Sequence, residues 1–127
     1  MIDVKTGRVI TQEGLEIEPH YTFESFKATN YYKGQDGIRI IYLDEHQTIL
    51  GRKFIMSLFF RDGVIYMLSL ICCDVEVNEL EELKRKEIHD KILLEIGLPQ
   101  MKEFVWGKIS SDFDTRSNVS SINILYF

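Results

Sequence analysis

The segment from Phe54 to Cys73 is apolar at nearly every position, and Asp62-Gly63 interrupts it near its middle. Asp-Gly is a two-residue turn signal because both positions tolerate φ > 0, so the segment predicts one β-hairpin. Counting outward from the turn pairs Phe60 with Ile65, Leu58 with Met67 and Phe54 with Ile71 on one face. The other face then carries Ile55, Phe59, Tyr66, Leu68, Leu70 and Cys72. Both faces of the predicted hairpin are apolar, so both need cover from water.

Shorter runs with alternating or β-branched residues predict further strands on both sides of this hairpin. Residues 2–5 and 8–11 form a hairpin around Thr6-Gly7, and residues 37–43 and 48–52 lead into the central hairpin as a three-strand meander. Residues 104–111 and 119–126 are the last two strands, separated by turn-forming residues 112–118. In the final strand Ile122, Ile124 and Tyr126 alternate with Ser121, Asn123 and Leu125, which is typical of a strand with one buried face.

Helical patterns occur at two places. Asn78 is a good N-cap with Glu81 in the capping-box position, and Gly97 followed by Pro99 is a stop signal, so a long helix is expected over about 79–96. Thr22 caps a short helix over about 23–29, with Phe23 and Phe26 on its inner side. Residues 30–36 are a loop, in which Tyr31 and Tyr32 are exposed or hold the loop down.

These elements predict an α+β fold in one domain over residues 1–127, with a mainly antiparallel sheet of five to seven strands. Six strands at about 4.8 Å spacing make a sheet about 29 Å wide, whereas a helix is about 10 Å across. Two helices therefore cannot cover both faces. The uncovered side must curl on itself, pack on the N-terminal segment, or meet another molecule.

Composition and charge narrow the class of protein. The chain is 45% hydrophobic and 28% charged, as in soluble globular proteins, and no apolar run reaches the ~20 residues that span a bilayer. The N-terminus has no secretion-signal pattern, so we expect a cytoplasmic protein. The net charge of −5 argues against direct nucleic-acid binding and favours a basic partner. Cys72 and Cys73 are adjacent, so we expect reduced packing residues and no disulfide between them.

The one basic run, Lys84-Arg85-Lys86, lies among glutamates on the predicted long helix. Glu81 with Arg85, Glu82 with Lys86 and Glu87 with Lys91 have the i,i+4 spacing of helix-surface ion pairs. The run is therefore interpreted as a solvated helix surface.

Motifs for chemistry are absent from the sequence. The three histidines are scattered, no Cys-x-x-Cys or His-x-x-x-His spacing occurs, and no glycine-rich phosphate loop occurs, so no metal and no cofactor are expected. Ser110-Ser111-Asp112-Phe113-Asp114 is the most enzyme-like cluster, but Ser and Asp also fill polar turns, and the turn is the preferred interpretation. His89 is assigned to the helix surface. Trp106 is a core or edge plug, or an interface anchor. These patterns favour a protein without enzymatic activity.

Several short motifs together resemble a group of small bacterial cytosolic proteins, some of which resemble immunity proteins of polymorphic and contact-dependent toxin systems. They are Gly51-Arg52-Lys53-Phe54, Phe60-Arg61-Asp62-Gly63, Glu87-Ile88-His89-Asp90, Gly97-Leu98-Pro99, Trp106-Gly107-Lys108-Ile109-Ser110-Ser111 with Asp114 and Arg116, Ser121-Ile122-Asn123-Ile124, and the opening Asp3-Val4-Lys5-Thr6-Gly7 with Ile17-Glu18-Pro19 and Phe26. The resemblance covers nearly the whole chain. It implies a protein that binds a toxin domain and blocks its active site, often with acidic surface against a basic nuclease.

The leading hypothesis is therefore a non-enzymatic binding protein that neutralises a cognate protein toxin. The candidate contact residues are Tyr31, Tyr32, Glu79, Glu82, Asp112 and Asp114. The alternative is a self-associating structural or regulatory module in which the spare sheet face forms a homodimer.

Overall fold

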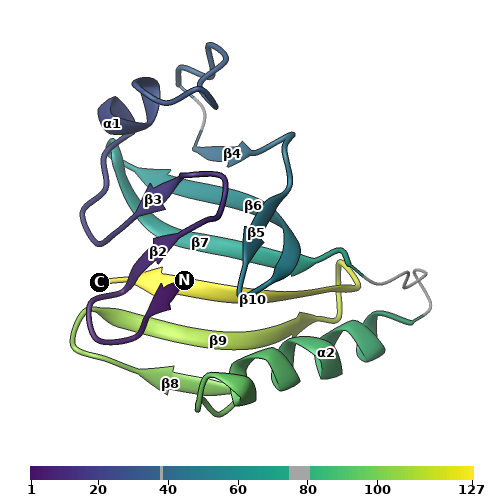
Figure 1. The fold of residues 1–127 in the computed structure, drawn as a ribbon. Helices are drawn as coiled ribbons and strands as arrows, with labels where there is room; N and C mark the ends of the chain where they lie inside the picture. The colour runs from purple at the N-terminus through teal and green to yellow at the C-terminus, as the bar shows by residue number, and fades with distance from the viewer. Residues whose placement is uncertain (38, 75–80) are drawn as a thin grey trace.

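The computed structural model describes residues 1–37, 39–74 and 81–127, and these form an α+β fold with two antiparallel sheets (Figure 1). The small sheet has the order β1 (Ile2–Asp3), β2 (Arg8–Ile10), β3 (Glu16–Ile17). The large sheet contains β4 (Ile40–Tyr42), β5 (Gln47–Ile49), β6 (Arg52–Arg61), β7 (Val64–Cys72), β8 (Met101–Glu103), β9 (Gly107–Asp114) and β10 (Val119–Tyr126). Its order is β4-β6-β7-β10-β9-β8, and β5 also pairs with β6. The helices are α1 (Phe23–Lys27) and α2 (Glu82–Glu95). The expected α+β class is confirmed.

The central hairpin is β6 and β7, and its turn residues Asp62 and Gly63 both have positive φ, as the sequence predicts. The predicted register is correct at the turn, where Phe60 pairs with Ile65, and wrong beyond it. Phe59 pairs with Met67, so Tyr66 is an extra residue in β7 and forms a β-bulge. The bulge shifts every later pair by one residue. Leu68, Leu70 and Cys72 therefore lie opposite Leu58, Met56 and Phe54, on one fully buried face.

The strands before the hairpin differ from the predicted meander. The segments expected at 37–43 and 48–52 are shorter, and β4 and β5 pair with different parts of the long strand β6. Ile40 to Tyr42 pair with Phe59 to Ser57, whereas Gln47 to Ile49 pair with Phe54 to Arg52. The two short strands thus share one edge of the large sheet.

The N-terminal segment contains the predicted hairpin β1–β2 and the predicted helix α1. Thr22 caps α1 by accepting the Ser25 N–H at 3.1 Å, and Phe26 is fully buried. Gly7, at φ +80°, faces the Trp106 ring, and the Trp106 indole N–H donates to the Val4 carbonyl at 2.9 Å. Trp106 also stacks on Phe104 at 5.1 Å. Trp106 is therefore a plug between the N-terminal hairpin and the large sheet.

One face of the large sheet receives all the packing that the described residues provide. On β10 the side chains of Ser120 and Tyr126 share a face, because they are six residues apart. The Tyr126 hydroxyl donates to the Gly7 carbonyl at 2.9 Å, and the Ser120 hydroxyl donates to the Glu82 carbonyl at 3.1 Å. The small sheet and α2 thus lie on the same side of the large sheet, in front of it in Figure 1. Phe26 of α1 packs on Phe60 from that side too.

The long helix is shorter than expected in the described part of the chain, where α2 runs from Glu82 to Glu95. The predicted cap at Asn78 and the candidate Glu79 lie outside the described residues. The helix ends as predicted, because Gly97 has φ +80° and the Leu98 N–H donates to the Leu93 carbonyl at 2.9 Å. Its ion pairs are not the predicted ones: Lys84 pairs with Glu81, Arg85 with Glu82, and Lys86 with Asp90.

Candidate functional site

The second face of the large sheet, here called the open sheet face, is the strongest candidate for a functional surface. It carries Ile55, Phe59, Met67, Ile71 and Leu125, which point away from the side that α2 and the small sheet cover. Phe59, Met67 and Leu125 form one row across three strands, and Ile55 lies opposite Ile71. Ile55 is 38% exposed, and Tyr42 at the β4 edge is 67% exposed. No element in residues 1–37, 39–74 or 81–127 packs over this face.

An aromatic cluster stands on the open sheet face because of the bulge in β7. The extra residue Tyr66 lies edge-on against Phe59, with ring centroids 6.1 Å apart. The Arg61 guanidinium lies over the Tyr66 ring at 4.6 Å from its centroid. Tyr, Arg, Phe and Met are the residue types that are enriched at the centres of protein interfaces.

A polar row crosses the same face beside the aromatic cluster. Ser57, Ser69, Asn123 and Ser110 are cross-strand neighbours from β6 to β9. Asp112 stands next to this row, where its Oδ2 accepts from the Ser110 hydroxyl at 2.6 Å and from the Asn123 amide at 2.8 Å. Within the described residues its Oδ1 has no hydrogen bond. The carboxylate is thus held in place with one oxygen available to an outside donor.

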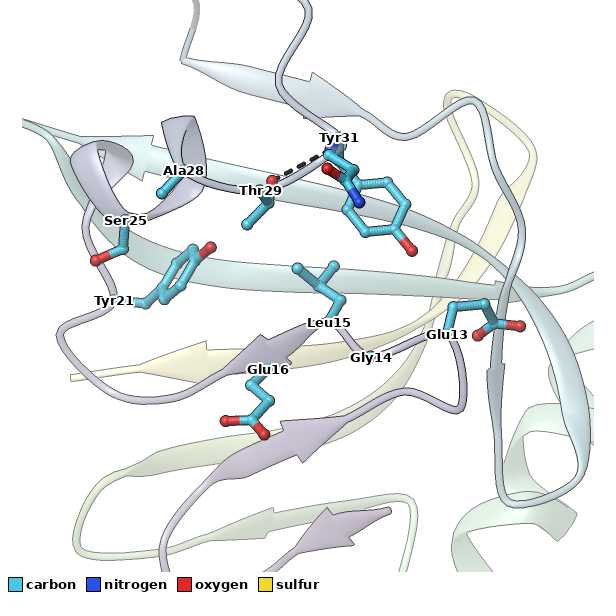
Figure 2. A pocket seen from close by; sticks show the side chains of 10 residues that line it. Glu13, Gly14, Leu15, Glu16, Tyr21, Ser25, Ala28, Thr29 and Tyr31 are labelled. Carbon is cyan, nitrogen blue, oxygen red and sulfur yellow. Dashed lines mark hydrogen bonds between the residues drawn. The ribbon is translucent and has the colours of Figure 1, made fainter.

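A groove on the opposite side of the molecule contains the candidate Tyr31 (Figure 2). It has a volume of about 430 Å³ and lies between the β2–β3 turn, α1 and the following loop. Tyr21 and Tyr31 stand on its two sides, with Leu15 between them. The carboxylates on its rim already have partners, because Glu13 accepts from the Thr48 N–H and hydroxyl and Glu16 pairs with Arg8. These bonds to Thr48 lower the pKa of Glu13.

Tyr32 holds its loop down rather than standing free. Its ring packs edge-on against Phe23 and Phe26, and its hydroxyl donates to Asp36 at 2.6 Å. The Lys27 ammonium lies 3.4 Å from the same carboxylate. Tyr32 therefore stabilises the α1 region, and of the two candidate tyrosines it is Tyr31 that lines the groove.

Glu82 is buried, so the prediction that it presents an exposed carboxylate is wrong. Its Oε2 accepts the Ser120 N–H at 3.1 Å, and its other oxygen pairs with the Arg85 guanidinium. His89, about two turns further along α2, is also fully buried, which contradicts its assignment to the helix surface. Its Nε2 accepts the Cys72 N–H at 3.0 Å. Burial, with a smaller contribution from the nearby Arg85, lowers the pKa of His89 to about 4.

Sequence-based prediction missed the burial of Glu82 and His89 because charged and polar residues are usually assigned to the solvent side of a helix. A signal was present in the sequence, since Glu82, Arg85 and His89 are spaced i, i+3 and i+7 and continue into Ile92 and Ile96. The face that these residues share is the one that packs on the sheet.

Ser110 and Ser111 lie in β9, as the predicted strand over 104–111 has them, but β9 continues to Asp114, so the interpretation of residues 112–114 as a turn is wrong. Alternation along the strand places Ser110, Asp112 and Asp114 on the open sheet face and Ser111 in the interior. Asp114 accepts the Arg116 N–H at 2.9 Å, which lowers the pKa of its carboxyl group. The structure thus brings Asp112 and Asp114 to the open sheet face, and places Tyr31 and Tyr32 on the far side of the sheet.

Metal binding and membrane insertion find no support in the part of the chain that the structure describes. No group of three or more His, Cys, Asp or Glu residues there is arranged to hold a metal ion. None of the described helices has the length and apolar character needed to cross a bilayer. Comparisons with protein-family models, curated proteins and solved structures found no match to this chain.

Proposed function

We propose that this protein is a non-enzymatic binding protein that neutralises a cognate bacterial toxin domain, and that the open sheet face is its contact surface. The observation that carries the proposal is a sheet that is covered on one side only and carries partly exposed apolar side chains beside a polar row on the other. Large exposed apolar patches on soluble proteins mark interaction sites.

The dimensions of this surface fit a protein partner. The long strands β6, β7, β10 and β9 lie side by side, and at about 4.8 Å per strand and 3.4 Å per residue they span roughly 19 by 27 Å. The short strands at both edges widen the face toward the ~800 Å² that each partner contributes to a standard interface. A face of this size, with apolar and polar rows side by side, suits a protein better than a small molecule, which needs a concave site.

Charge supports a basic partner. The net charge of −5 attracts a basic protein over distances longer than a direct contact. At the contact itself, Asp112 is already held by Ser110 and Asn123, so accepting a lysine or arginine from the partner requires no reordering of its side chain.

Co-expression with the product of the neighbouring reading frame, followed by co-purification and a growth-rescue assay, tests the proposal. Ile55→Asp places an unpaired charge on the open sheet face, opposite Ile71, and should weaken binding by tenfold or more, with loss of rescue. Asp112→Asn should weaken binding several-fold, and this loss should shrink at high salt. Val105→Asp, at a fully exposed loop position, is the matched control and should bind like the wild type.

Failure of the wild type to form a complex or to rescue growth would end the proposal. The alternative hypothesis, a homodimer through the same face, predicts instead a dimer by light scattering that Ile55→Asp converts to a monomer. Equal binding by Ile55→Asp and Val105→Asp would show that the partner lies elsewhere on the molecule.

A further inference from the structure

The outer surface of α2, on the side opposite the sheet, carries a stripe of two leucines with a glutamate and a lysine between them. Each helical residue turns the side-chain direction by about 100°, so Leu83, Glu87, Lys91 and Leu94 fall on one side and His89 and Ile92 on the other. Leu83 is 65% exposed and Leu94 is 70% exposed. The helix therefore buries a polar side chain, Glu82, on its inner side and exposes two leucines to water on its outer side.

The charges between the two leucines are not used inside the described part of the molecule. Glu87 and Lys91 are exposed and have i,i+4 spacing, yet neither takes part in an ion pair there. Asp90, which is next to them, is already paired with Lys86 at 2.8 Å. One free anion and one free cation thus lie in the middle of the stripe.

The surface beside Leu94 is hollow. A depression of about 480 Å³ is lined by Leu94, Leu98, Pro99 and the stems of Asp90, Lys91 and Gln100. A second depression, about 430 Å³, lies beside Ile88 and shares Lys91 with the first. Together the hollows extend along α2 and offer space for side chains of a second helix.

We propose that α2 is a homodimerisation surface on which two copies of this chain pack their helices antiparallel about a two-fold axis. Leu83 of each copy enters the hollow formed by Leu94, Leu98 and Pro99 of the other copy. Glu87 of each copy pairs with Lys91 of the other. This contact is separate from the open sheet face and does not depend on the proposed toxin-binding function.

A second copy is the occupant because the stripe is complementary to itself in one direction only. In the antiparallel arrangement the second helix runs in the opposite direction, so its residues are met in the order Leu94, Lys91, Glu87, Leu83. Leu83 of one copy then faces Leu94 of the other, and Glu87 faces Lys91. A parallel arrangement would place Glu87 against Glu87 and Lys91 against Lys91, which is repulsive. The charge order thus selects both the partner and its direction.

The interface is small. A helix of 14 residues is about 21 Å long and about 10 Å wide, so the dimer buries less than the ~1,200 Å² of a standard stable interface. The expected dimer is therefore in rapid exchange with monomer, with a Kd of about 10–500 μM.

Sedimentation velocity between 10 μM and 1 mM tests the dimer through a charge swap. Glu87→Lys and Lys91→Glu should each weaken dimerisation at least tenfold, because both place like charges opposite each other. The double variant restores opposite charges and should dimerise like the wild type. A wild type that stays monomeric up to 1 mM, or a double variant that stays as weak as the single ones, would overturn the proposal.

The leucines provide an independent check. Leu83→Glu should abolish the dimer, whereas the control Val105→Glu should leave it unchanged, and circular dichroism confirms that both variants are folded. Ile55→Asp, on the open sheet face, should also leave the dimer intact. Dimer loss in Ile55→Asp but not in Leu83→Glu would place the contact on the open sheet face and refute the role of α2.

Discussion

Protonation of His89 is expected to destabilise the fold below neutral pH. The imidazole is fully buried between α2 and the sheet, where its Nε2 accepts the Cys72 N–H at 3.0 Å. Adding a proton removes this acceptor and places a positive charge near Arg85. Burial and this neighbouring charge lower the pKa of His89 to about 4, compared with 6.5 for a free imidazole.

The size and sign of the effect follow from that difference. The unfolded chain binds the proton more tightly than the folded chain, so the stability that neutral His89 contributes is present above pH 6.5 and is lost as the pH falls toward 4. At about 1.4 kcal/mol per pH unit, the loss is about 3 kcal/mol over this window. That is a large part of the 5–15 kcal/mol typical of a small domain.

Urea unfolding at pH 7.0, 5.5 and 4.2 measures this loss. His89→Gln keeps a side-chain oxygen that can accept the Cys72 N–H but does not titrate. As the pH falls, the free energy of unfolding of the wild type should therefore decrease by about 2–3 kcal/mol relative to that of His89→Gln. His46→Gln, at an exposed position, is the control and should follow the wild type at every pH. A difference between wild type and His89→Gln that stays constant with pH would show that burial of His89 does not make the stability of the fold depend on pH.

Two further predictions concern stability and use paired variants in chemical denaturation. Glu82→Gln leaves the largely buried Arg85 without its counterion and should lower the free energy of unfolding by about 2–4 kcal/mol. Glu81→Gln, in a more exposed pair, should lower it by less than about 0.5 kcal/mol. Equal losses would contradict the contribution of the buried ion pair. Gly7→Ala places a Cβ 2.5 Å from the Trp106 ring and should cost more than about 2 kcal/mol, with a change in tryptophan fluorescence. Gly14→Ala, at positive φ in open space, should cost only about 1 kcal/mol, so matching losses would contradict the contact with Trp106.

Local signals in the sequence predicted local structure. The Asp62-Gly63 turn, the Thr22 cap, the Gly97 stop and the alternation in residues 119–126 each depend on neighbours within a few residues, and each is present in the structure. The bulge at Tyr66 was not predictable in this way. It is defined by which residue of β6 pairs with which residue of β7, and no residue type marks it.

The inner side of α2 shows the same limit. The spacing of Glu82, Arg85 and His89 places them on one side of the helix, but their partners Ser120 and Cys72 come from distant strands. Without those partners, a buried glutamate looks unfavourable and is assigned to the surface. The open sheet face likewise depends on the pairing of β7 with β10, which brings Leu125 beside Met67.

The binding role of the open sheet face is tested most directly by methyl NMR of the complex with the product of the neighbouring reading frame. The methyl signals of Ile55, Met67 and Leu125 should shift on complex formation. The methyl signals of Leu83 and Leu94, on the opposite side of the molecule, should stay where they are in the free protein at the same concentration. Shifts confined to the two α2 leucines, with Ile55 and Met67 unchanged, would contradict binding through the open sheet face.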